Sequence, residues 1–258
     1  MPLVMILTAL ASGAAIGLIL AGLGAGGSIL MTPLLVYAVG VPSAHAAVGT
    51  SAVAVTLNAL VGLAGHARVG TVKWRCAGVF AAAGVMGATL GAELGKALDG
   101  KRLLMLFGLL MIGVGMAMLR PRRSEERADV RLTASSAGYL LPRLIPIGLG
   151  TGLLAGFFGI GGGFLIVPGL IAATAMPMRF ASGTSLVIVA ALGATTATSY
   201  ALSGYVDWPL VMVLVVGGLG GAVLGLAGTR LLAERRGLIE RGFALLVIAV
   251  GIYVAMQG

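Results

Sequence analysis

The charged residues of this chain are confined to a few short stretches, and this distribution limits the possible folds more than any other feature. No Asp, Glu, Lys or Arg precedes Arg68, and none follows Arg241. Another charge-free stretch runs from Arg143 to Arg179. With 59% apolar and only 10% charged residues, the chain is too apolar for a soluble domain of this length. The sequence therefore predicts an all-α polytopic membrane protein.

The remaining charges divide the chain into parts. Nine of the charged residues lie between Arg120 and Arg143 and indicate a solvated linker between two apolar halves. We predict an N-terminal transmembrane repeat over 1–119, a charged cytoplasmic linker over 120–137 and a C-terminal transmembrane repeat over 138–258. The net charge of +9 comes from an excess of Lys and Arg, which the cytoplasmic loops of membrane proteins normally carry, so it does not indicate nucleic-acid binding. The single cysteine, Cys76, excludes an internal disulfide and a CxxC motif.

Apolar runs long enough to cross a bilayer, about 20 residues each, occur eight times, four in each half. They cover Leu3–Ala21, Ala46–Gly65, Arg75–Gly95, Leu103–Leu119, Leu140–Phe158, Ser182–Ala201, Pro209–Thr229 and Leu238–Met256. Two shorter apolar segments, Ser28–Val39 and Phe164–Ala175, follow Gly-rich turns and are too short for a regular spanning helix. We expect each of them to be a broken helix.

The two halves repeat one another. A shift of 134 residues aligns the triplet Gly49-Thr50-Ser51 with Gly183-Thr184-Ser185, and it aligns the two tryptophans of the chain, Trp74 and Trp208. The same shift aligns glycines at 84, 87 and 91 with those at 218, 221 and 225, for which we expect helix packing. A shift of 135 aligns the glycines and prolines of the two short segments. The sequence therefore predicts an internal duplication.

The positions of the basic residues favour inverted repeats. If the short segments cross the membrane, each half has five crossings and the second half is inverted. One orientation then places 14 of the 17 basic residues on the cytoplasmic side, and only Lys96, Lys101 and Arg102 outside. If each short segment instead enters the membrane and returns to the same side, the two halves are parallel. The basic residues then divide evenly between the two sides of the membrane, an arrangement that the positive-inside rule does not favour. We predict inverted repeats with both termini outside.

The Gly-rich turns are the main candidates for a ligand site. Consecutive glycines at the start of a short helix let backbone N–H groups approach an anion, and a helix N-terminus adds partial positive charge. Such breaks at matching places in two repeats point to a transport site. Close helix packing is the alternative for the glycines, and helix capping is the alternative for the hydroxyl triplets. The candidate substrate-binding residues are Gly26, Gly27, Ser28, Thr50, Ser51, Gly161, Gly162, Gly163, Thr184 and Ser185.

Three further polar residues are weaker candidates for the site. Asn58 lies two helical turns beyond Ser51, but its repeat partner is Leu192. Arg179 and His45 stand at nearly equivalent places in the two halves, and the membrane interface is the alternative position for Arg179. We expect Glu93 and Lys96 to form an ion pair near a helix end. The sequence contains no recognisable catalytic set, metal-ligand motif or cofactor motif, so we do not expect an enzyme.

On these motifs, the sequence resembles the sulfite exporter TauE/SafE family, also called the 4-toluenesulfonate uptake permease family. The resemblance rests on the Gly22–Pro33 segment, the Gly49-Thr50-Ser51 triplet, the Gly70-x-Val72-x-Trp74 stretch and the second copies from Gly156 to Trp208. It implies a carrier of sulfite or organosulfonates in the bacterial inner membrane. The family is described with seven or eight membrane helices, and our count of ten crossings departs from that description.

We therefore expect a multi-pass secondary transporter of small sulfur-containing anions, with sulfite or a sulfonate bound between the two repeats. The alternative is a channel or a non-transporting assembly subunit in which the glycines serve packing only. The expected partners are the small sulfur oxyanion or sulfonate and the lipid bilayer. The sequence leaves open whether the protein forms a homodimer.

Overall fold

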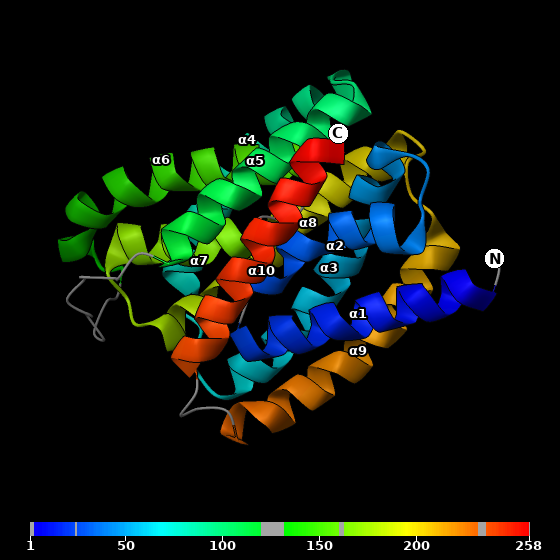
Figure 1. Cartoon of the computed structure of the whole chain (residues 1–258). Helices are drawn as coiled ribbons and strands as arrows, with labels where there is room; N and C mark the ends of the chain where they lie inside the picture. The colour runs from blue at the N-terminus through cyan, green and yellow to red at the C-terminus, as the bar shows by residue number, and fades with distance from the viewer. Residues whose placement is uncertain (1–2, 24, 120–131, 160–162, 232–235, 258) are drawn as a thin grey trace.

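The computed structural model describes residues 3–23, 25–119, 132–159, 163–231 and 236–257, and these residues are almost entirely helical, with no strand among them. Figure 1 shows the helices packed into one bundle. In chain order they are α1 (Leu3–Leu23), η1 (Ala25–Leu30), α2 (Met31–Pro33), η2 (Leu34–Val39), α3 (Ala44–Arg68), α4 (Trp74–Ala97), α5 (Gly100–Leu119), α6 (Ala134–Phe158), α7 (Gly163–Thr174), α8 (Met178–Leu202), α9 (Trp208–Leu231) and α10 (Arg236–Gln257).

The eight predicted long segments are all helices, with ends within a few residues of the expected ones except at the start of α6. Seven of the described helices are long and apolar enough to cross a membrane, and the apolar part of α10 is shorter, from Arg241 to Gln257. The all-α membrane fold is thus confirmed. Helix α6 begins at Ala134, so residues 134–137 of the predicted linker belong to a helix. Residues 120–131 lie outside the described part.

The first short segment is irregular, as the sequence predicts. It consists of a 3₁₀ turn (η1), one turn of α-helix (α2) and a π-helical turn (η2), which ends at Gly40 in the left-handed conformation with φ of 83°. The second short segment, α7, is a single 12-residue helix that contains Pro168. The two segments pack against each other, since η1 contacts α7. The two short segments therefore meet inside the bundle.

Helices from opposite halves form the largest interfaces. Helix α1 packs along α9 and helix α4 along α6 (Figure 1). Both pairs are parallel, because Gly13 faces Leu214 and Gly17 faces Gly218, while Gly148 faces Phe80 and Gly152 faces Gly84. A Cβ at Gly13, Gly17, Gly148 or Gly152 would meet a backbone carbonyl of the partner helix. The prediction that the repeated glycines serve helix packing is confirmed for 87, 91 and 221, where a Cβ would also meet such a carbonyl. At 84 and 218 a Cβ would first meet the side chains of Leu192 in α8 and Asn58 in α3.

The remaining two large interfaces join repeat-related helices and are antiparallel. In the α3–α8 pair, Gly62 faces Leu186 whereas Gly49 faces Tyr205. In the α5–α10 pair, Gly108 faces Ala255 and Gly115 faces Ala244. Repeats related by an axis along the membrane normal would make these equivalent helices parallel. Antiparallel packing of these helices agrees with the inverted arrangement, which stays a prediction.

The antiparallel α3–α8 pair defines two ends of the bundle. We call the end that holds the start of α3 and the end of α8 the α3-start end, and the opposite one the α8-start end. Glycines 70 and 204, at repeat-related positions, take left-handed conformations with φ of 72° and 75° in the turns that follow α3 and α8. Trp74 and Trp208 then begin α4 and α9 and are exposed, as residues at a membrane interface are.

Candidate functional site

Ser51 lies where the two repeats meet near the α3-start end. Its hydroxyl lies 3.1 Å from the hydroxyl of Thr32 in α2, and it donates to the carbonyl oxygen of Val48 at 2.9 Å. The carbonyl oxygen of Gly159, at the end of α6, lies 3.4 Å from the same hydroxyl. Ser51 and Thr32 are buried. One side chain therefore joins α3, the first broken segment and the turn that precedes the second.

Gly159 needs to be glycine for two reasons. Its φ of 65° lies in the left-handed region, which side chains with a Cβ disfavour. A Cβ there would also overlap the side chain of Val48. Gly159, where the Gly-rich turn after α6 begins, is thus held close to α3. Gly163, its last residue, begins α7 and is buried, whereas Gly161 and Gly162 lie outside the described residues.

The equivalent group in the other repeat lies near the α8-start end. Ser185 is fully buried and donates to the carbonyl oxygen of Ser182 at 2.7 Å. Helix η1, which contains Gly26, Gly27 and the fully buried Ser28, contacts both α7 and α8. The first Gly-rich break is thus next to the helix that carries the second hydroxyl triplet.

The two threonines of the triplets make reciprocal bonds between the repeats. The hydroxyl of Thr50 accepts a hydrogen bond from the backbone N–H of Asp207 at 3.0 Å, at the start of α9. The hydroxyl of Thr184 accepts one from the backbone N–H of Lys73 at 3.0 Å, at the start of α4. Thr50 and Thr184 are repeat partners, and so are Lys73 and Asp207. Each threonine thus satisfies a donor at the start of a helix in the other half.

The structure separates the predicted site residues into two groups. Because α3 and α8 are antiparallel, Ser185 lies beside the stretch from Gly62 to His66, while Ser51 lies eleven or more residues earlier on α3. At 1.5 Å rise per residue, the two serines are roughly 20 Å apart along the bundle. A small anion cannot contact both at once. The two serines therefore belong to two separate groups near opposite ends of α3.

The three weaker candidates lie at different depths. His45 is next to the ring of Tyr205 at 5.4 Å between centroids, and its buried Nδ1 has no hydrogen-bond partner in the part of the chain that the structure describes. The guanidinium of Arg179 lies 4.5 Å from the centre of the Phe180 ring, near the start of α8. Asn58 is 4% exposed near the middle of α3.

Asn58 has an environment that sequence alone did not reveal. Both polar atoms of its side chain, Nδ2 and Oδ1, are buried without a partner among the described residues. The amide lies against Gly218 of α9, and at the equivalent place in the other half Leu192 lies against Gly84. An unsatisfied amide in a membrane-embedded interface is costly and marks a candidate for function.

Sequence reasoning missed two members of the Ser51 group, Thr32 and the carbonyl of Gly159. Thr32 lies within the Gly22–Pro33 motif, directly before Pro33, so its place in the motif was a usable signal. The role of the Gly159 carbonyl depends on a contact across 108 positions of sequence, which no local pattern shows.

Comparison with known proteins agrees with this architecture. The family model described as "Sulfite exporter TauE/SafE" matches residues 9–254. The chain belongs to the sulfite exporter TauE/SafE family. Two proteins of Xylella fastidiosa strains, each named "Probable membrane transporter protein", are 48% identical to it over 250 residues, which cover 96% of this chain and 94% of each relative. The "Probable membrane transporter protein YunE" of Bacillus subtilis is 26% identical over 253 residues, with 92% of each chain covered.

No solved structure matches the chain at a significant level. Membership of the TauE/SafE family makes this chain a multi-pass membrane transporter, and the family and its relatives are named as transporters rather than enzymes. The resemblance inferred from the Gly-rich and Gly-Thr-Ser motifs is thus confirmed.

Proposed function

We propose that this TauE/SafE protein is a secondary carrier that moves a small sulfur-containing anion, sulfite or an organosulfonate, by alternating access between two inverted repeats. The observation that carries the proposal is the reciprocal pair of bonds, Thr50 to Asp207 and Thr184 to Lys73. Two equivalent contacts at opposite ends of an antiparallel helix pair are what a two-fold axis in the membrane plane produces. We place the protein in the inner membrane of a bacterium.

The anion would occupy the two half-sites in turn. The first consists of Ser51 with the Gly161–Gly163 turn, and the second of Ser185 with Gly26, Gly27 and Ser28. Backbone N–H groups and hydroxyls supply the donors in both. The Ser51 and Ser185 hydroxyls now donate to carbonyls of their own helix, and rotation about one bond would turn them to a bound anion. Such a shell suits a compact oxyanion that must also be released.

Ligand-dependent stability tests the class of substrate. We expect sulfite, thiosulfate or a sulfonate to raise the unfolding temperature of purified protein more than carboxylates, phosphate or cations do, because a ligand that binds only the folded state stabilises it. Flux into proteoliposomes should saturate with concentration and respond to the proton gradient or to the membrane potential. Stabilisation by a cation alone would contradict the proposal, and flux that does not saturate would indicate a channel.

Valine substitutions test the Gly-rich turns. Gly27→Val and Gly162→Val should abolish transport while folded protein remains in the membrane, since a side chain would keep the anion from the backbone donors. Gly78→Val is the matched control, because a Cβ at Gly78 meets nothing within 4 Å. Normal flux in both turn variants would show that the turns are structural only.

Serine substitutions distinguish two half-sites from one shared site. If the two half-sites are equal alternatives, Ser51→Ala or Ser185→Ala alone should lower the total affinity by at most about twofold, because the other half-site remains. The double variant should lose the full hydrogen-bond contribution, about 1–3 kcal/mol. Calorimetry with the best anion measures both. Equal affinity in the double variant and the wild type would remove these hydroxyls from the site.

A further inference from the structure

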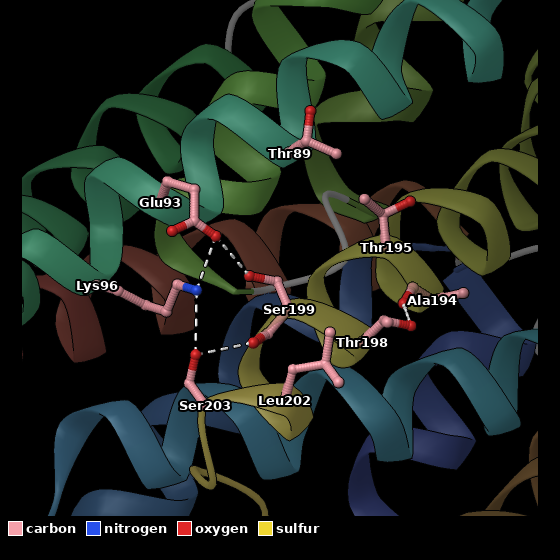
Figure 2. A pocket seen from close by; sticks show the side chains of 9 residues that line it. All are labelled: Thr89, Glu93, Lys96, Ala194, Thr195, Thr198, Ser199, Leu202 and Ser203. Carbon is pink, nitrogen blue, oxygen red and sulfur yellow. Dashed lines mark hydrogen bonds and ion pairs between the residues drawn. The ribbon is translucent and has the colours of Figure 1, made fainter.

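A groove lies between α4 and α8 near the α3-start end, outside the two half-sites. Its volume is about 670 Å³, and five hydroxyl side chains line it, those of Thr89, Thr195, Thr198, Ser199 and Ser203. The charged residues Glu93 and Lys96 and the apolar residues Ala194 and Leu202 complete the lining (Figure 2). Thr195 lies seven residues before the end of α8, so the groove reaches about 10 Å along the helix.

The groove already holds an oxyanion, the carboxylate of Glu93. Figure 2 shows Lys96 between the two helices, with Nζ 2.7 Å from Oε1 of Glu93 and 3.1 Å from the hydroxyl of Ser203. The hydroxyl of Ser199 donates to the same Oε1 at 3.1 Å. The expected Glu93–Lys96 pair is thus confirmed, but with two hydroxyls of α8 added to it. An ammonium and a hydroxyl donor on one carboxylate oxygen are the ligands that a free oxyanion would need.

The two charges differ in exposure, and the difference makes exchange feasible. The Lys96 side chain is 16% exposed, whereas the Glu93 side chain is 70% exposed. The ammonium is therefore held in place by α4 and α8, while the carboxylate can turn into solvent on its flexible side chain. Exposed ion pairs of this kind contribute little stability, so a competing anion can displace the carboxylate at small cost.

The repeat supplies an internal comparison for this groove. The positions related to Thr89, Thr195 and Thr198 by the 134-residue shift are Val223, Val61 and Ala64. Ser199, Ser203 and Glu93 correspond to Gly65, Val69 and Ala227. Val61 and Val223 are exposed, as side chains that face lipid are. Lys96 corresponds to Arg230, so a basic residue occurs at this place in both halves. The hydroxyls and the carboxylate occur at one end of the bundle only, so they are not a requirement of the fold.

Tyr200 is a buried neighbour, in the sequence, of the groove residue Ser199. It follows Ser199 on α8, is fully buried, and packs in the cluster that contains Val48 and Phe158. Its hydroxyl has no hydrogen-bond partner among the residues that the structure describes. Val48 in turn contacts the Gly159 turn. A buried hydroxyl without a partner among the described residues thus belongs to a side chain that follows Ser199 on α8 and lies close to Gly49 of α3.

We propose that the α4–α8 groove is a second anion-binding site, in which a small oxyanion takes the place of the Glu93 carboxylate at Lys96 and Ser199. The Ser203 hydroxyl, which now donates to the carbonyl of Ser199, would turn to the anion as a further donor. This inference rests on the proposed function, for which the groove would be the entrance at the α3-start end. Lys96 supplies the charge that attracts the anion, and Glu93 is a tethered competitor that keeps binding weak enough for release.

Cysteine accessibility in lipid nanodiscs tests whether the groove holds water. The single native cysteine is buried and can be replaced by Cys76→Ala. On that background, Thr198→Cys should react with a charged, membrane-impermeant thiol reagent, and sulfate should slow the reaction. Ala64→Cys, at the repeat-related position, is the matched control and should not react. Equal protection of both cysteines from the reagent would mean that lipid or a second copy covers the groove, and would overturn the proposal.

The sulfate concentration that halves the modification rate of Thr198→Cys reports affinity at the groove itself. Lys96→Gln should raise this concentration at least about tenfold, since it removes a charged hydrogen bond. Glu93→Gln should lower this sulfate concentration about two- to fivefold, because the carboxylate, one partner of an exposed ion pair, no longer competes with sulfate for Lys96. Lys101→Gln, which removes an exposed charge outside the groove, should leave it unchanged. Protection that is insensitive to Lys96, or weaker in Glu93→Gln, would refute the site.

Flux separates this proposal from the carrier function. If the groove is an entrance, Lys96→Gln should raise the KM for sulfite and leave the maximal rate and the unfolding temperature without anion near those of the wild type. If Lys96→Gln transports sulfite with an unchanged KM, the groove is not an entrance, whereas the carrier function is not contradicted. Absence of any sulfur-anion flux in the wild type would instead disprove the carrier function, whatever the groove binds.

Discussion

Gly87 of α4 offers the sharpest test of how the two repeats are held together. A Cβ at this position would overlap the carbonyl oxygen of Leu149 in α6 and lie 2.7 Å from the backbone nitrogen of Leu153. Ordinary contact begins near 3.4 Å, so the two helices would have to separate by about 0.7 Å or more. Both neighbours are backbone atoms, which no side-chain rotation can move. Gly87→Ala should therefore disturb the whole α4–α6 interface.

The size of the effect follows from a comparison within one helix. Overpacking of a close interface costs about 1–3 kcal/mol. The alanine also gains about 0.5–1 kcal/mol from the lower conformational entropy of its unfolded state. Gly78→Ala, on the exposed face of α4, receives the same gain and meets nothing within 4 Å. The difference in the free energy of unfolding between the two variants thus isolates the packing cost, about 1–3 kcal/mol.

Reversible unfolding in mixed micelles, followed by circular dichroism, measures this difference. Gly221→Ala, the repeat partner of Gly87→Ala, should show a loss of the same sign, because a Cβ there would overlap the carbonyl of Ala14 in α1. A Gly87→Ala protein as stable as Gly78→Ala would show that α4 and α6 are not in backbone contact. The reasoning on the repeated glycines would then be wrong.

Three other predictions concern topology, the reciprocal bonds and the buried amide. A reporter active only in the periplasm should work when fused after Gly258 and fail within residues 124–129, because 14 of the 17 basic residues would then face the cytoplasm; the opposite result overturns the inverted topology. Thr50→Val and Thr184→Val should each destabilise the protein by about 0.5–1.5 kcal/mol, measured in the same micelles, and clearly unequal losses would argue against symmetric roles. Asn58→Leu should raise the unfolding temperature and lower transport, since Leu fits the equivalent place in the other half; normal transport would exclude Asn58 from the pathway.

Much of the fold could be predicted from the sequence because the bilayer imposes a simple rule on composition. In the bilayer the backbone polar groups must be bonded within a helix, and a helix needs about 20 mostly apolar residues to cross. The apolar runs of the sequence therefore mark the helices. The breaks at Gly22–Pro33 and Gly159–Pro168 were visible for the same reason, since glycine and proline interrupt such runs. The shift that aligns Trp74 with Trp208 likewise predicts the duplication without any structure.

The partners of the individual polar groups could not be predicted, because they depend on which helices of opposite halves are neighbours. The Gly-Thr-Ser triplets were correctly picked out, yet Thr50 and Thr184 bond to helix starts 157 and 111 positions away. Sequence identity between the triplets suggested one shared site, whereas the antiparallel packing of α3 and α8 places Ser51 and Ser185 roughly 20 Å apart.

The sequence by itself determined the membrane environment, the helices and the breaks, and it predicts the duplication, because each of these depends on local composition or on self-comparison. Only the tertiary structure decided the directions of the helix pairs, the reciprocal threonine bonds and the burial of the Asn58 amide without a partner among the described residues. It also brought Lys96 and Glu93 of α4 to Ser199 and Ser203 of α8, more than 100 positions apart. Contacts across such separations are fixed by how whole helices pack, and no local pattern of residues records them.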